Sequence, residues 1–152
     1  MITILAIENH PDKEIDSLCN KYIQRTSGPF KLQLELIPAA RTRDPELQKV
    51  KESENILKAI KTGDILILCD ENGESMQSIP FSNFIEKKLS QSRGRLVFAI
   101  GGAHGFSKEL LDKYNSIRLT DFTLPHHLAR LVLVEQIYRA FEINKGSGYH
   151  HI

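Results

Sequence analysis

Apolar positions along the chain follow two patterns, one typical of buried strands and one typical of amphipathic helices. Short apolar or alternating runs predict strands over residues 2–7, 30–37, 64–70, 95–100 and 117–119. Apolar residues at helical spacing predict helices over residues 12–25, 47–60, 82–90, 108–114 and from Pro125 onward. Strands and helices that alternate in this way predict an α/β fold, a doubly wound and mostly parallel sheet flanked by helices. Such sheets bind ligands at the carboxyl ends of their strands.

Glycines and polar residues mark the expected ends of these elements. Asn72-Gly73 predicts a turn after the strand 64–70, and Ser107 is a suitable N-cap for the helix that follows it. The chain shows no internal repeat, low-complexity tract or linker. Its 152 residues are enough for one core, so a single domain over residues 1–152 is expected.

The final helix is apolar around most of its circumference. Its apolar residues are Leu128, Ala129, Leu131, Val132, Leu133, Val134, Ile137, Tyr138, Ala140 and Phe141. A helix that is apolar on all sides is buried on all sides, and a small domain rarely achieves this alone. The pattern therefore favours a subunit interface, with a central helix inside a monomer as the alternative.

Composition excludes several classes of protein. Hydrophobic residues make up 41% and charged residues 26% of the chain, as in ordinary globular proteins. The net charge of +1 gives no overall attraction to nucleic acid, so a polyanion would need a local basic patch. The longest apolar run falls far short of the roughly 20 residues of a membrane-spanning helix. The first residues read as a core strand and not as a signal peptide, so a cytoplasmic protein is expected.

Metal and disulfide sites are not expected. Cys19 and Cys69 are isolated in the sequence and form no CxxC motif. His126 and His127 are adjacent, and successive side chains of a helix point in different directions, so they do not have the spacing of metal ligands.

Two loops near the carboxyl end carry candidate chemistry. Gly101-Gly102-Ala103-His104-Gly105 follows a buried strand, where the backbone of glycines can approach a ligand closely. Its spacing is neither GxGxxG nor a Walker A motif, so a plain strand-to-helix turn is equally favoured. The second loop, residues 119–124, offers backbone groups suited to an adenine ring, or simply closes over the core.

The last residues are ambiguous when taken by themselves. Tyr149-His150-His151 follows Gly146-Ser147-Gly148 and would ordinarily be a frayed terminus. Arg139 lies four residues after Glu135, a spacing that by itself indicates a helical ion pair. The residues alone therefore predict an α/β domain with a pocket at its strand ends.

Four segments together are more specific than each is alone. They are Ile100 to Phe106, Leu119 to His126, Ile137 to Ala140, and Tyr149-His150. Their order and spacing closely resemble the bacterial ribosomal RNA large subunit methyltransferase H family of the SPOUT superfamily. The resemblance spans the chain, with its specificity in the C-terminal half.

The resemblance implies both an activity and a fold. The activity is S-adenosylmethionine-dependent methylation of N3 of a pseudouridine in 23S rRNA, without a metal. The fold is an α/β knot with a C-terminal trefoil knot, in a homodimer that packs through the knot helices. A non-catalytic RNA- or ribosome-binding module with the same fold is the alternative.

The resemblance also assigns roles to residues. It places the cofactor against Leu68, Cys69, Gly101, Arg118, Leu119, Thr120, Asp121, Phe122, Thr123 and Leu124. Arg139, Tyr149 and His150 would face the nucleotide as catalytic residues, with the tail folded over a pocket of its own or of the partner subunit. Arg139 would stabilise the N3 anion and His150 is a candidate proton acceptor.

Two departures from the family and one basic cluster complete the expectations. Ala103-His104 stands where some members carry Pro-Glu, and His151 stands where some relatives carry Arg, a better phosphate partner than neutral His. Arg41, Arg43, Lys49 and Lys51 are expected to contact the rRNA, with a solvated surface as the alternative.

Overall fold

The computed structural model describes residues 1–151, and Ile152 lies outside the described residues. Five parallel strands form one sheet in the order β2-β1-β4-β3-β5. The strands are β1 (Ile2–Ile7), β2 (Leu32–Ile37), β3 (Ile65–Ser75), β4 (Leu96–Ile100) and β5 (Ser116–Arg118). The predicted α/β fold with a parallel sheet is confirmed.

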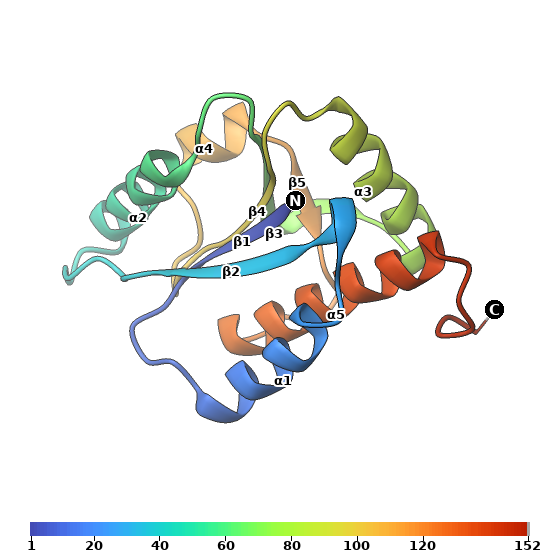
Figure 1. The fold of residues 1–152 in the computed structure, drawn as a ribbon. Helices are drawn as coiled ribbons and strands as arrows, with labels where there is room; N and C mark the ends of the chain where they lie inside the picture. The colour runs from blue at the N-terminus through green and yellow to red at the C-terminus, as the bar shows by residue number, and fades with distance from the viewer. Residues whose placement is uncertain (152) are drawn as a thin grey trace.

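Helices cover both faces of this sheet (Figure 1). They are α1 (Lys13–Ile23), α2 (Pro45–Ala59), α3 (Ser78–Gln91), α4 (Lys108–Lys113) and α5 (His126–Asn144), with a short 3₁₀ turn at Gly28–Phe30. Side chains of Asp12, Asp44 and Ser107 accept hydrogen bonds from the first-turn N–H groups of α1, α2 and α4. Each cap satisfies donors that the helix itself leaves unpaired.

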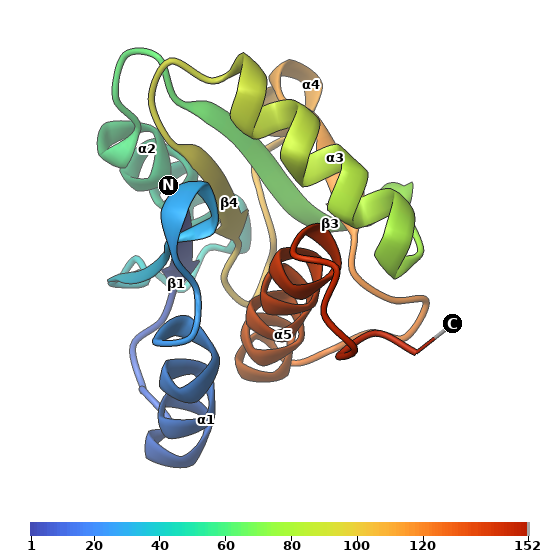
Figure 2. The same cartoon turned by 45° about the vertical axis from the view of Figure 1, so that its right-hand side comes forward.

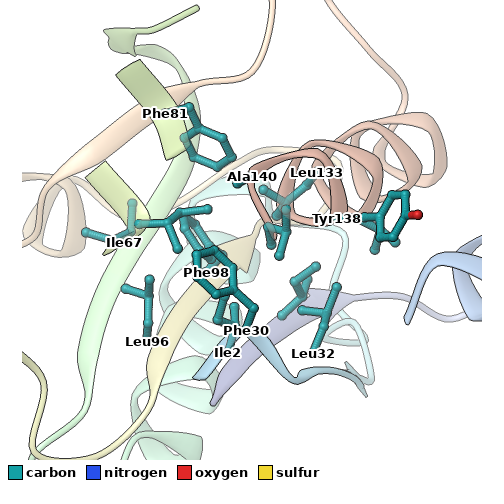
Figure 3. Packing of buried hydrophobic residues seen from close by; sticks show 14 of the residues in the cluster. Ile2, Phe30, Leu32, Ile67, Phe81, Leu96, Phe98, Leu133, Tyr138 and Ala140 are labelled. Carbon is teal, nitrogen blue, oxygen red and sulfur yellow. The ribbon is translucent and has the colours of Figure 1, made fainter. Parts of the chain in front are cut away.

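Alternation along the strands divides the interior into two cores. In β1, Ile2 and Ile4 face the layer of α1, α3 and α5, while Leu5 and Ile7 face α2 and α4. Figure 3 shows the first of these cores, where Phe98 of β4 packs between the sheet and the helices. Strands buried on both faces require the continuous apolar runs that the sequence displays.

The final helix α5 lies between α1 and α3 on one face of the sheet (Figure 2). Its buried residues include Leu133, Val134 and Ile137, all without solvent exposure. Most of the apolar surface of α5 is therefore buried within one chain. This is what the alternative, a central helix inside a monomer, predicts. A partly exposed row that includes Leu128, at 42% exposure, and Val132 remains open, and the homodimer stays a prediction.

The turn predicted at Asn72-Gly73 is wrong. Both residues lie inside β3, which runs five residues further than expected. Ile117 of β5 pairs with Cys69 and again with Glu74, so the residues between form an irregularity in the ladder. A Cβ on Gly73 would lie 2.5 Å from the carbonyl carbon of Ile117, so glycine serves a close backbone approach and not a turn.

One predicted helix boundary differs from the structure. Helix α3 begins at Ser78, four residues before its predicted start. None of the helices described over residues 1–151 is long and apolar enough to cross a membrane. The trefoil knot stays a prediction.

Candidate functional site

A cavity of about 380 Å³ opens at the carboxyl edge of the sheet. Because all strands are parallel, the segments that leave β4 and β5 meet at this edge, beside the middle of β3, which is level with the end of β4. The lining residues are Cys69, Asp70, Glu71, Ile100, Gly101, Gly102, Ala103, His104, Gly105, Arg118, Leu119, Thr120, Phe122, Thr123, Leu124, Pro125, His126 and Ala129. Both loops singled out in the sequence therefore contribute walls of a single cavity.

The glycine loop is tightly packed against its surroundings. Gly102 and Gly105 form an isolated bridge, and the positive φ of 75° belongs to Gly105 and not to Gly101. A Cβ on Gly101 would lie 3.2 Å from the backbone of Gly105, and one on Gly102 would lie 2.5 Å from a carboxylate oxygen of Glu52. Two of these glycines thus allow the loop to fold back on itself and rest on α2.

Glu52 supports the glycine loop from behind. Its side chain is buried in α2, and its Oε1 accepts hydrogen bonds from the backbone N–H of Ala40 and the side chain of Gln48. Its Oε2 has no hydrogen-bond partner among the described residues and lies beside Gly102. No sequence pattern singled out this residue, since its signal is burial alone.

The loop after β5 supplies the opposite wall. Arg118 makes an ion pair with Asp121 at 3.1 Å, while its Nε is buried without a partner among residues 1–151. The aromatic ring of Phe122 is 82% exposed, although large apolar side chains are usually covered. This wall combines an unused hydrogen-bond donor with an apolar group open to a binding partner.

The middle of β3, level with the end of β4, brings a neutral thiol and two carboxyl groups to the cavity. Burial, followed by the nearby charge of Asp70, raises the pKa of Cys69, so the thiol stays protonated at neutral pH. A protonated thiol is a weak nucleophile, which makes Cys69 an apolar part of the wall. Asp70 and Glu71 give this side of the cavity negative charge.

Most residues expected to bind the cofactor line this cavity. Leu68 and Asp121 are not among its described lining residues. Successive side chains of a strand point to opposite faces, so Leu68 lies in the core beneath α2 and α4 while Cys69 faces the cavity. Asp121 does not line the cavity but makes an ion pair with Arg118, which does. Pro125, His126 and Ala129 were missed, although each adjoins a predicted loop.

The expected catalytic residues form a separate cluster at the end of α5. Arg139 donates to Glu135 at 2.6 Å, approaches Nδ1 of His150 at 3.3 Å and lies over the ring of Tyr149. The hydroxyl of Tyr149 donates to Glu135 at 3.1 Å. Burial, followed by this hydrogen bond to a carboxylate, raises the pKa of Tyr149, so the phenol stays neutral. The tail is therefore docked by specific contacts, and Glu135 is their common acceptor.

This cluster does not lie at the cavity of its own chain. Ala129 lines the cavity, and Arg139 follows it ten positions later along the same helix. Ten helical residues span about 15 Å. Within one chain the tail packs on α5, with the Tyr149 ring 4.9 Å from that of Tyr138, and no described tail residue lines the cavity. That the tail folds over the pocket of a partner subunit stays a prediction.

The expectation that His126 and His127 diverge is wrong. His126 Nε2 lies 3.1 Å and His127 Nδ1 lies 2.8 Å from the same oxygen of Glu8, at the end of β1. The two rings use different nitrogens, and the helix begins at His126, so adjacent residues converge on one atom.

The expected basic contacts lie on the segment that follows β2 and on α2. Arg41, Arg43 and Lys51 are exposed, whereas Lys49 makes an ion pair with Glu46 at 3.0 Å. Because β2 is parallel to its neighbours, the segment after it leaves from the same edge as the cavity.

A family described as predicted SPOUT methyltransferases matches residues 1–150 of the chain. The chain belongs to the SPOUT methyltransferase family. The cavity at the carboxyl ends of its strands is therefore the candidate ligand site of a SPOUT methyltransferase, a family that generally uses S-adenosylmethionine.

Named relatives match this SPOUT methyltransferase over nearly its full length. The ribosomal RNA large subunit methyltransferase H of Bacteroides fragilis is 39% identical over 98% of both chains. The protein of the same name from Bacteroides thetaiotaomicron is 38% identical over 98% of both chains. That of Christiangramia forsetii is 38% identical over 99% of this chain and 98% of its own.

Proposed function

We propose that this protein transfers a methyl group from S-adenosylmethionine to N3 of a pseudouridine in 23S rRNA of the large ribosomal subunit. The observation that carries the proposal is one cavity, built by β3 and by the segments that follow β4 and β5, in a chain of the SPOUT methyltransferase family. The relatives named as ribosomal RNA large subunit methyltransferase H supply the substrate class.

The residues present fit this cofactor. The cavity volume of about 380 Å³ lies in the range of sites for drug-sized ligands. The buried Nε of Arg118, unpaired among the described residues, offers a donor to a ligand oxygen or nitrogen. Asp70 and Glu71 favour a cation, such as a sulfonium or an ammonium group, on their side of the cavity. The loops of residues 101–105 and 118–124 would hold the adenosine part through backbone groups.

When bound, the cofactor supplies an electrophilic methyl group on a sulfonium. This chain must then hold the nucleotide in line and favour loss of the N3 proton. Arg139 would place positive charge beside the developing anion, and the ring of Tyr149 would pack against the base. His150, which contacts Arg139, would accept the proton.

The separation of the tail from the cavity of its own chain supports a composite site. Arg139, Tyr149 and His150 act on the nucleotide only if they lie near a bound cofactor. A homodimer that packs through α5 would bring the tail of one subunit to the cavity of the other. The exposed side chains of Phe122 and Leu128, which flank the start of α5, are suited to such an interface.

The large RNA substrate would be held by local charge and not by the whole molecule. Exposed Arg41, Arg43 and Lys51 are the proposed phosphate contacts, because the net charge of +1 supplies no general attraction. We further propose that the chain is a single domain with a trefoil knot. It would act in the cytoplasm on a ribosomal subunit or an assembled ribosome.

The test separates cofactor binding from methyl transfer. S-adenosylmethionine binding is measured by calorimetry, and transfer is measured by single turnover on ribosomes lacking the modification, with mass spectrometry of the 23S rRNA. We expect wild type to bind and to methylate. We expect Arg139→Ala, and deletion of residues 149–152, to lose transfer by about a hundredfold or more while changing cofactor affinity little.

A matched control is Arg93→Ala, an exposed arginine far from α5 in the sequence, which should leave both measurements unchanged. Absence of S-adenosylmethionine binding by wild type would contradict the activity and favour a binding module. Normal turnover of the truncated protein would show that the tail takes no part.

A further inference from the structure

Three side chains with metal-binding chemistry converge where β1 ends and α5 begins. Glu8 Oε2 lies 2.8 Å from His127 Nδ1 and 3.1 Å from His126 Nε2. One ligand atom from each of the three residues lies within 4.8 Å of the others. A carboxylate and two imidazoles are the donor set of many three-ligand zinc sites, in which water takes the fourth position.

The carboxylate is held in place before any ion binds. Its side chain is 3% exposed, and its second oxygen, Oε1, accepts a hydrogen bond from the backbone N–H of His10 at 2.8 Å. Glu8 is thus an ordered side chain whose second oxygen, Oε2, faces the two histidines.

The two histidine rings are partly exposed, and the described side-chain hydrogen bonds and ion pairs of both rings are with Glu8. Their side chains are 35% and 32% exposed, and their rings lie 4.3 Å apart at an angle of 71°. In a tetrahedral site with bonds of about 2.0 Å, ligand atoms stand about 3.3 Å apart. The observed separations of 2.8 and 3.1 Å from Glu8 are somewhat shorter than this distance. The two partly exposed rings would therefore rotate outward to admit an ion.

We propose that Glu8, His126 and His127 bind one divalent transition-metal ion of the zinc class. Nitrogen-rich ligands of this type favour zinc, nickel or copper over magnesium or calcium, which prefer all-oxygen sites. The site is distinct from the tail cluster, and the metal proposal does not rest on the proposed methyl transfer.

The position of the site gives the ion a defined mechanical effect. Glu8 belongs to the first strand end and His127 to the last helix, 119 residues later. His126 also lines the cavity. A bound ion would link these two distant segments through coordinate bonds. It would thereby fix the start of α5, next to the loop that supplies one cavity wall.

The test uses the full chain without a polyhistidine tag, stripped with chelator and titrated with Zn²⁺ by calorimetry. Co²⁺ serves as a second probe, because its absorption in the visible range reports ligand type and coordination geometry. We expect one Zn²⁺ per chain, and a tetrahedral Co²⁺ spectrum that Zn²⁺ displaces. Glu8→Gln and His127→Gln should each weaken binding by at least about tenfold.

Two controls make the result specific. The double variant His150→Ala, His151→Ala removes the histidines of the tail and should bind Zn²⁺ as wild type does. Thermal unfolding in chelator checks that Glu8→Gln and His127→Gln remain folded, and added Zn²⁺ should raise the melting temperature of wild type but not of these variants. Unchanged affinity in His127→Gln, loss of binding in the tail variant, or no Zn²⁺ binding by wild type would overturn the proposal.

Discussion

Gly102 shows how a single absent side chain shapes the candidate site. It lines the cavity on one side and touches α2 on the other, where the carboxylate of Glu52 is 1% exposed. A Cβ there would lie 2.5 Å from Glu52 Oε2 and 3.1 Å from Ile7. Neither neighbour is free to move, because one is held by two hydrogen bonds and the other belongs to the core of the sheet.

We expect Gly102→Ala to lower the free energy of unfolding by about 1–3 kcal/mol through overpacking. It should also weaken S-adenosylmethionine binding, because the loop must move away from Glu52. Urea unfolding and calorimetry measure the two effects. Gly148→Ala is the control, since its Cβ meets no described atom within 4 Å. Equal unfolding midpoints for Gly102→Ala and wild type would show that the loop accommodates the added methyl group with no loss in the free energy of unfolding.

Sequence reasoning identified a loop that lines the cavity, but not the role of each glycine in it. Of these glycines it singled out only Gly101, whereas the positive φ lies at Gly105 and the tightest contact at Gly102. The sequence reveals that a glycine is present but not its φ or its neighbours. Those depend on Glu52 and Ile7, which lie on other elements and carry no local signal.

Among the elements, β3 and β4 are joined at their amino ends by a buried ion pair. Arg95 donates to Asp64 from Nη2 at 2.7 Å and from its backbone N–H at 2.7 Å, and the side chains are only 11% and 2% exposed. Burial disfavours the charged carboxylate, but the hydrogen bonds from Arg95 and Lys61 outweigh it and lower the pKa of Asp64.

We expect Asp64→Asn to lower the free energy of unfolding by about 3 kcal/mol at neutral pH, because it removes the buried counter-charge of a buried guanidinium and leaves only Glu35, a half-exposed carboxylate 3.5 Å away. A lowered pKa adds stability above the ordinary aspartate value of about 4 and loses it as pH falls through the folded value. The difference between wild type and variant should therefore shrink below about pH 4. Urea unfolding across pH 3–7 measures it.

The control for this prediction is Asp112→Asn, which breaks an exposed pair with Lys108. Its unfolding midpoint should match that of wild type at every pH, because exposed pairs contribute little. A gap that stays constant through the acid range would mean that Asp64 is not the titrating group.

The elements themselves were largely predictable, because buried strands and amphipathic helices leave strong periodic patterns. The exception is the end of β3, where Asn72-Gly73 has the composition of a turn but lies in extended backbone. The need for glycine arises from Ile117, a residue 44 positions later, so no local pattern reveals it. The tail shows the same limit, since its docking depends on Glu135 and Tyr138 and not on its own composition.

For the whole molecule, α5 separates residues that support the fold from residues available to a partner. Leu133 has no solvent exposure and lies in the core of its own chain, whereas Leu128 is 42% exposed near the cavity. The two leucines are five residues apart on one helix and therefore distinguish folding from association.

We expect wild type to sediment as a dimer at micromolar concentration. Leu128→Lys should remain folded and shift toward monomer, because it places a charge at the proposed interface. Leu133→Lys should fail to fold, since a lysine there is buried without a partner. Leu18→Lys, on the exposed side of α1 at 41% exposure, is the matched control and should stay dimeric. A monomeric wild type would contradict the homodimer directly.

The strand order also constrains how the chain folds during its synthesis. β1 pairs with β2 through nearby residues such as Ile2 with Leu32, but its other neighbour is β4, where Ile2 meets Leu96. Contacts between residues so distant in sequence close slowly, because a long loop must lose its freedom first. A nascent chain that has not yet reached Leu96 therefore carries one unpaired apolar edge on β1. The sheet gains its last strand, β5, only when synthesis has passed Arg118 of the 152 residues.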